Sequence, residues 1–245
     1  MSFDTTPQKI ESGTSGLDDV LHGGLLSGHT AIVTGGPRTG KTILALQFLA
    51  AADGDALYIG FEERERELRR NAEHLGIDLS DVSILDLSAK GDHFFSEEAY
   101  TLFSSEEVEG EKLLKQIASA IENYDVDRLV VDPLSELRSL LPDDFQFRRN
   151  ISSLFNTLND RDITGEFRST NYQTSYLADN LIFLQYLEVD GDIEKAIGVL
   201  KKRFGGFEQS LRELWIDTGG LHVGERLSGY RGILTGTPEP TTEDR

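Results

Sequence analysis

Residues 34–42 read TGGPRTGKT, and the spacing Gly-x-x-x-x-Gly-Lys-Thr within this stretch decides the fold. Glycines let the backbone turn tightly without Cβ clashes. Successive amide groups in such a turn, followed by the positive end of a helix, form an anion site. The β-branched run at 30–34 is typical of a strand, and residues 43–52 are good helix formers. This context predicts a phosphate-binding loop in which Lys41 reaches the β- and γ-phosphates of ATP and Thr42 holds Mg²⁺.

Composition limits the class of protein. The chain has 245 residues, 38% of them hydrophobic, which suits one large α/β domain or two small ones. The absence of cysteine excludes a disulfide scaffold and a thiolate metal site. The polar N-terminal sequence shows no signal peptide, and no apolar run approaches the roughly 18 residues needed to span a membrane. We therefore expect a cytoplasmic protein that does not associate with a membrane.

The charge is strongly negative, at −19 from 43 acidic and 24 basic side chains. Such a charge repels a nucleic-acid backbone, so DNA is not an expected partner. Two explanations remain open, a cationic partner or adaptation to a very salty cytoplasm. Acidic clusters are spread over the whole chain, at 62–67, 97–98, 106–111 and 143–144. This spread favours salt adaptation and a halophilic source over a single acidic docking patch.

Strand and helix patterns alternate up to about residue 165, which predicts a mostly parallel central sheet flanked by helices. The expected strands lie at 30–34, 55–63, 82–88 and 129–131, and the expected helices at 17–21, 43–52, 64–76, 110–126 and 145–162. Three late strand patterns, at 180–189, 195–203 and 212–224, predict an antiparallel C-terminal edge. The N-terminal residues 1–12 are expected to be loose, 89–111 to form a surface excursion or lid, and 235–245 to be disordered.

A phosphate loop needs a carboxylate for Mg²⁺ at the tip of a nearby strand. Asp132 in RLVVDP ends an apolar run and meets this requirement, and it could at the same time cap a helix that starts at Pro133. Glu62 and Glu63 end the strand that follows the loop's helix, at the sheet edge where ligands bind in open α/β folds. Their position makes them candidates for activating water, against the simpler explanation of two solvated acids.

Five stretches carry a resemblance to a known family. They are SGTSGLDDVLHGGL, GGPRTGKT, YIGFEERERELRRNA, RLVVDPLSEL and KAIGVLKKRFG. In this order they resemble the KaiC-like ATPases of the RecA superfamily, over about residues 8–238. The resemblance implies an α/β RecA-like P-loop NTPase fold in a single domain, residues 1–238. From their composition, residues 239–245 are expected to form a disordered acidic tail.

The resemblance also implies roles for individual residues. Glu62, together with Glu63, matches the catalytic carboxylate pair, and Asp132 matches the second residue on the Mg²⁺ side. Lys201 and Arg203 match basic residues that reach into a neighbouring subunit's ATP site, which implies a homo-oligomeric ring, most often a hexamer. The alternative for these two is a solvated basic strand end. The expected ATP-contacting residues are Gly35, Gly36, Pro37, Arg38, Thr39, Gly40, Lys41, Thr42, Lys201 and Arg203, and those on Mg²⁺ are Thr42 and Asp132.

Several functions remain open within this resemblance. The first is a regulatory, clock-like ATPase with an unknown protein partner. The second is an autokinase, since Ser175 matches a hydroxyl that the family phosphorylates. Tyr176 replaces the threonine beside it, and Thr170 and Thr174 are nearby hydroxyls. The third is a nucleotide-gated binding module with little turnover, and the fourth a recombinase paralogue, which the lack of a basic patch disfavours.

The chain departs from the family after residues 159–165, NDRDITG, where about ten residues and the apolar run of a buried strand are missing. Either DITGEF forms a minimal strand, or the sheet is shortened and its neighbours lose their partner. Such a deletion could weaken or abolish hydrolysis. Arg38 also replaces a glycine at a variable position of the loop and could lie over the phosphates.

Overall fold

The computed structural model describes residues 8–88, 106–124, 126–141, 143–169, 177–189, 191–228, 230–231 and 239–240. Its helices are α1 (Leu17–Val20), α2 (Lys41–Ala50), α3 (Glu65–His74), α4 (Glu106–Asn123), α5 (Leu134–Leu140) and α6 (Asp144–Asp160). Its main strands are β3 (Thr30–Gly35), β4 (Asp55–Gly60), β5 (Val82–Asp86), β6 (Val126–Asp132), β7 (Thr164–Ser169), β8 (Asn180–Val189), β9 (Asp192–Lys202), β10 (Arg212–Asp217) and β11 (Gly220–Arg226).

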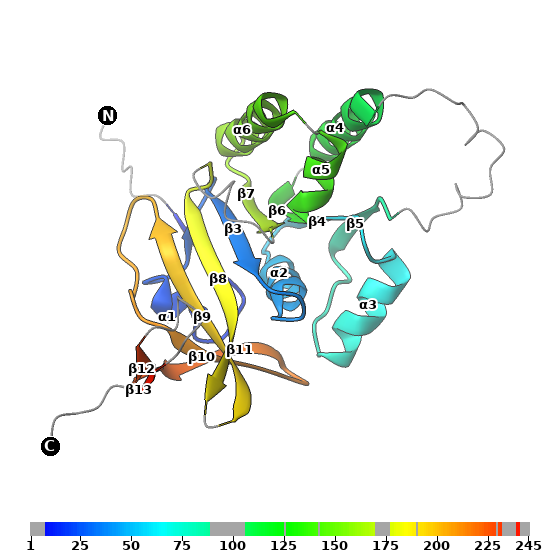
Figure 1. Ribbon diagram of the computed structural model, residues 1–245. Coiled ribbons are helices and arrows are strands. Elements are labelled where there is room, and N and C mark those ends of the chain that lie inside the picture. The colour runs from blue at the N-terminus through cyan, green and yellow to red at the C-terminus, as the bar shows by residue number, and fades with distance from the viewer. Residues whose placement is uncertain are drawn as a thin grey trace, which may run out of the picture.

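These nine strands form one sheet in the order β11-β10-β9-β8-β3-β7-β6-β4-β5. Every pair from β8 to β5 is parallel, and the pairs β8–β9, β9–β10 and β10–β11 are antiparallel. Helices lie on both sides of the parallel part, with α4, α5 and α6 on one side and α2 and α3 on the other (Figure 1). The expected α/β fold of the RecA-like P-loop type, with an antiparallel C-terminal edge, is confirmed.

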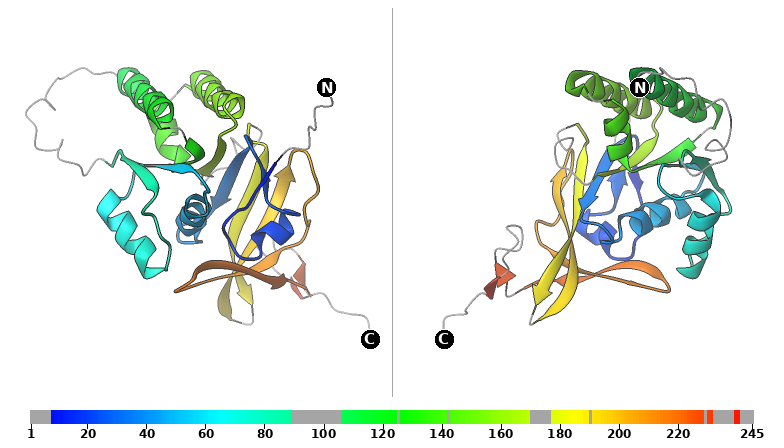
Figure 2. Two further views of the ribbon diagram at one scale, coloured as in Figure 1. Left: turned by 180° about the vertical axis from the view of Figure 1, so that it is seen from behind. Right: turned by 45° about the vertical axis from the view of Figure 1, so that its right-hand side comes forward.

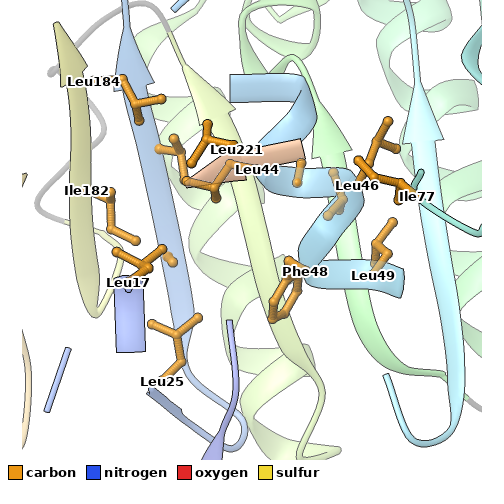
Figure 3. Close-up of a cluster of buried hydrophobic side chains, with 14 of the residues drawn as sticks. Leu17, Leu25, Leu44, Leu46, Phe48, Leu49, Ile77, Ile182, Leu184 and Leu221 are labelled. Carbon is orange, nitrogen blue, oxygen red and sulfur yellow. The ribbon is translucent and has the colours of Figure 1, made fainter. Parts of the chain in front are cut away.

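Alternation of side chains along the strands produces two separate cores. On β3, for example, Ala31 and Val33 face α2, whereas Ile32 packs with α4, α5 and α6. The core around α2 is shown in Figure 3, where Leu44, Phe48 and other side chains of this apolar helix lie between the strands. Helix α2 is hydrophobic on nearly all sides, as expected for a helix that packs against the parallel sheet and is also contacted by β11.

Strand β7 shows that the segment around DITGEF forms a strand and that the sheet is not shortened there. It is a minimal six-residue strand, TGEFRS, whose residues are all buried. It pairs with β3 on one side and β6 on the other, so neither neighbour loses its partner. The strand lacks an apolar run because only Phe167 faces the α6 core, where its ring lies 4.5 Å from that of Phe155. The other face of β7 carries Glu166 and Arg168, both buried.

Some elements differ from the expectations. The helix considered after Asp132 is present as α5, but its N-cap is Pro133, so Asp132 does not cap it. Two short strands, β1 (Lys9–Ile10) and β2 (Leu25–Leu26), pair antiparallel, so the last residues of the segment expected to be loose are held in a ribbon. The pattern at 212–224 is a hairpin of two strands. Figure 2 shows this hairpin at the end of the molecule opposite α4 and α6.

Two expectations fall largely outside the described residues. Of the proposed surface excursion, 89–105 lie outside them and 106–111 begin helix α4. Of the tail, Glu239–Pro240 form β13, paired with β12 (Tyr230–Arg231), and the rest lies outside. Among the helices that the structure describes, none combines the length and apolar character that crossing a membrane requires.

Candidate functional site

The phosphate loop connects the buried strand β3 to helix α2, as its sequence predicts. Glycine is required at Gly35 because an added Cβ would lie 2.4 Å from the carbonyl oxygen of Leu184 on β8. It is required again at Gly40, where φ is +112° and a Cβ would approach Leu221 and Ile216 within 3.0 Å. The β10–β11 hairpin therefore presses directly on the start of α2, which fixes the direction of the helix that follows the loop.

Lys41 is the first residue of α2, and its side chain folds back over the loop. Its Nζ donates hydrogen bonds to the carbonyl oxygens of Gly35, at 2.8 Å, and Gly36, at 2.7 Å. Burial and, to a lesser extent, Arg168 lower the pKa of Lys41 to about 8, and Glu62 offsets part of this effect. The ammonium group is therefore held at the loop by neutral carbonyls that negative phosphate oxygens can replace.

The tip of the loop is held by two further hydrogen bonds. Thr39 Oγ1 donates to the carbonyl oxygen of Gly36 at 2.9 Å. Tyr186 on β8 donates its hydroxyl to the carbonyl oxygen of Arg38 at 2.7 Å. Arg38 has φ +60° and is exposed, as are Gly36 and Pro37, so this part of the loop faces solvent. Its exposed guanidinium is compatible with the expected place over the phosphates.

Asp132 lies at the carboxyl edge of the sheet, as expected for a metal-side carboxylate. It ends β6 and is paired in register with Gly60, the last residue of β4. It is 3% exposed, and its Oδ2 accepts a hydrogen bond of 2.6 Å from the Tyr58 hydroxyl. The same oxygen forms an ion pair with the guanidinium of Arg168 on β7. Burial raises the pKa of Tyr58, so this hydroxyl keeps its proton as a donor.

Glu62 and Glu63 follow β4 on the same edge, but their surroundings differ. Glu62 is exposed and close enough to Lys41 and Arg168 to influence the pKa of both. Glu63 is partly buried and accepts a hydrogen bond from the Asn71 amide on α3. Burial raises the pKa of Glu63, and the Asn71 bond offsets part of this effect. The structure thus gathers Lys41, Glu62 and Asp132 at one edge of the sheet.

The oxygen ligands that Asp132 and Thr42 offer at this edge fit a magnesium ion that binds together with a nucleotide. The described residues hold no cluster of three or more His, Asp or Glu side chains that could bind a metal alone. Mg²⁺ is commonly held by one or two protein oxygens together with substrate phosphates. Asp132 Oδ1 is buried and has no hydrogen-bond partner among the described residues, so it can accept such an ion or one of its waters. Thr42 lies in the first turn of α2, where its hydroxyl can be a second ligand.

Lys201 and Arg203 lie at the other edge of the sheet. Lys201 pairs in register with Leu181, near the start of β8, and its Nζ bonds the carbonyl oxygen of Ala178. Arg203 forms an ion pair of 3.1 Å with Asp179, which is hydrogen-bonded to Thr30 at the start of β3. The phosphate loop begins five residues further along β3, which corresponds to about 16 Å. These two basic residues are therefore not brought to the phosphate loop of their own chain.

Sequence reasoning missed three neighbours of the site, Tyr58, Asn71 and Arg168. Tyr58 and Asn71 lie within YIGFEERERELRRNA, but which partner each would meet depends on strand register and on the packing of α3. Arg168 had a visible signal, because GEFRS alternates charged and other residues in a segment expected to be central. The candidate phosphorylation residues Ser175, Tyr176, Thr170 and Thr174 lie outside the described residues.

Comparisons with known proteins identify relatives of the chain. The chain is 29% identical over 251 residues to the circadian clock oscillator protein KaiC of Acaryochloris marina, covering 96% of this chain and 46% of the relative. It is 29% identical over 245 residues to the KaiC protein of Picosynechococcus, covering 94% of this chain and 45% of the relative. It is 28% identical over 251 residues to that of Thermostichus vulcanus, covering 96% and 46%.

The chain thus spans about half the length of the curated relatives it matches. A family model described as "ATPase: KaiC" matches residues 10–228, which is most of the chain. The strand–loop–helix arrangement at Gly35–Thr42 and the RecA-like sheet lie within this range. The chain belongs to the KaiC family of ATPases.

Proposed function

We propose that this chain is a single ATPase unit that binds ATP at the phosphate loop and hydrolyses it with Mg²⁺. The observation that carries the proposal is the gathering of Lys41, Glu62 and Asp132 around the end of β3, β4 and β6. Each has a different task in phosphoryl transfer, namely phosphate binding, activation of water and metal binding. Family membership supports the same reaction.

Most of the chemistry follows from what the chain's own residues can do. Lys41 would exchange its two loop carbonyls for phosphate oxygens, which strengthens its hydrogen bonds because the new acceptors are charged. Glu62 is exposed at the strand end, where it can orient a water molecule and accept its proton. When bound between Thr42 and Asp132, Mg²⁺ would supply charge neutralisation at the β- and γ-phosphates.

We further propose that the site is completed by a second copy of the chain. Lys201 and Arg203 lie about 16 Å from the loop of their own chain, so they can serve a phosphate site only across a subunit interface. A head-to-tail arrangement that closes into a ring, such as a hexamer, places these residues of one subunit beside the loop of the next. Hydrolysis at interfaces suits a regulatory, clock-like role, in which nucleotide state is read by another protein.

One observation favours a second candidate function. Asp132 is already paired with Arg168, which suits a nucleotide-gated binding module with little turnover. The deciding experiment incubates the purified chain with γ-labelled ATP and Mg²⁺ in molar KCl and follows the label. We expect label in free phosphate. Label remaining on bound ATP would support the low-turnover module instead, and label on the protein would support autophosphorylation, with Ser175 as the first residue to examine.

A further inference from the structure

Arg168 is a buried cation that contacts the carboxylate expected on the metal side of the site. Its guanidinium pairs with Asp132 Oδ2, and the two side chains are 10% and 4% exposed. Both residues lie on strands that are hydrogen-bonded on both sides, β6 between β7 and β4, and β7 between β3 and β6. The positions of both residues are therefore fixed by the centre of the sheet, and movement of a loop cannot separate them.

Strand register explains why Arg168 points toward the nucleotide site. Val131 pairs with Phe167, so Asp132 and Arg168 are the next residues on their strands and share a face. Phe167 occupies the α6 core, which directs Arg168 to the opposite face, beneath α2 and the phosphate loop. Arg168 also pairs in register with Val33 on β3, two residues before Gly35 of the phosphate loop, and it lowers the pKa of Lys41.

We propose that Arg168 is a resident counter-ion of Asp132, which competes with the metal for this carboxylate and makes nucleotide binding less dependent on Mg²⁺. The inference rests on the proposed nucleotide site. It adds a residue outside the phosphate loop and the paired glutamates, on strand β7.

The competition follows from the oxygens available on Asp132. Oδ2 is occupied by Arg168 and by the Tyr58 hydroxyl, which leaves Oδ1 for the metal. A divalent ion bound to Oδ1 would be repelled by the guanidinium on Oδ2, because both positive charges would be held by the same carboxylate. At the same time, the guanidinium already supplies positive charge at the site. ATP therefore gains less from Mg²⁺ here than it would with a neutral residue at position 168.

A purely structural role makes a different prediction. Many buried ion pairs only hold two strands together, and loss of one partner then destabilises the fold because a charge is left buried and unpaired. If Arg168 had only this role, its substitution would lower the free energy of unfolding but leave the effect of Mg²⁺ on ATP binding unchanged. The measured quantity must therefore be the coupling between metal and nucleotide.

The experiment measures the Kd of ATP by calorimetry in excess EDTA and in excess MgCl₂. The Kd in EDTA divided by the Kd in MgCl₂ measures the coupling between metal and nucleotide, without requiring turnover. We expect Arg168→Gln to raise this ratio by at least about tenfold, because Asp132 becomes an unpaired carboxylate available to the metal. Arg168→Met is a second neutral variant, whose thioether fills the buried volume if glutamine prevents folding. Arg168→Lys retains the charge and should stay close to the wild-type ratio.

Arg128 provides a matched control. It is also a buried arginine on the same face of the sheet, but it donates to the carbonyl oxygens of Glu11 and Phe48 at the far end of β6. Arg128→Gln should lower stability without changing the ratio. An unchanged ratio in the neutral variants of Arg168 would overturn the proposal. If the wild-type chain binds no ATP in either medium, the proposed nucleotide site itself is wrong, so the two failures are distinguishable.

Discussion

At the scale of single residues, Glu62 and Glu63 are adjacent in sequence but differ in accessibility. Glu62 is exposed, whereas Glu63 is partly buried and held by Asn71. We expect Glu62→Gln to lower kcat for ATP hydrolysis by about 10²- to 10⁴-fold, because the amide cannot accept a proton from water. The Kd of ATP should change little, since the substitution leaves the loop intact. Both quantities can be measured by phosphate release and calorimetry.

The control for this substitution is Glu73→Gln, an exposed glutamate in the last turn of α3 that removes the same charge away from the sheet edge. It should leave kcat unchanged. Normal hydrolysis by Glu62→Gln would show that the assignment of the water-activating carboxylate is wrong, and Glu63 would then be tested next.

Lys41 gives the site a pH dependence. Its pKa in the ligand-free protein is lowered to about 8, chiefly by burial, so the ammonium loses its proton as pH rises through 8. ATP binds the protonated form, and its Kd should therefore be nearly constant below pH 7 and rise toward about tenfold per pH unit above 8. Lys41→Arg keeps its charge across this range and should flatten the profile. A flat profile in the wild-type chain would contradict this interpretation of Lys41.

At the scale of elements, one side chain joins helix α2 to the edge strand β11. The Gln47 amide donates to the carbonyl oxygen of Leu221 at 3.3 Å and accepts from its amide at 3.0 Å. We expect Gln47→Met to lower the free energy of unfolding by about 2–4 kcal/mol, because both backbone groups stay buried without partners. Urea unfolding measures this. Gln116→Met, at an exposed position of α4, should stay within about 0.5 kcal/mol of wild type, and equal values for the two would argue against the Gln47 clamp.

The strands also differ in how well they could be predicted from the sequence. Strands β3, β4 and β6 were predictable because each is an apolar run that ends at a glycine or carboxylate. Strand β7 was left open because a buried strand with Glu166 and Arg168 violates the usual apolar pattern. Burial raises the pKa of Glu166 to about 8, which keeps this side chain neutral where it lies. The ion pair of Arg168 depends on the register between strands that are far apart in sequence. The periodicity of hydrophobic residues does not predict that register.

At the scale of the whole molecule, the net charge of −19 should oppose the folded state at low ionic strength. We expect the free energy of unfolding, measured with urea, to rise between 0.1 and 2 M KCl, since the Debye length falls to about 3 Å in 1 M salt. Choline chloride at the same ionic strength is the control for screening alone. Stability that is independent of salt would remove the argument for adaptation to a salty cytoplasm.

The proposed ring can be tested by complementation between two inactive subunits. Arg203 lies far from its own loop, so Arg203→Ala should abolish the site of the neighbouring subunit, and Glu62→Gln should abolish the subunit's own. In an equal mixture, about a quarter of the interfaces in a head-to-tail ring combine an intact Glu62 with an intact Arg203, and activity should return to about that level. Mixing Arg203→Ala with the double variant provides no complete interface and should give no rescue. Failure at every mixing ratio, or a monomer by light scattering with and without ATP, would show that each site acts within its own chain.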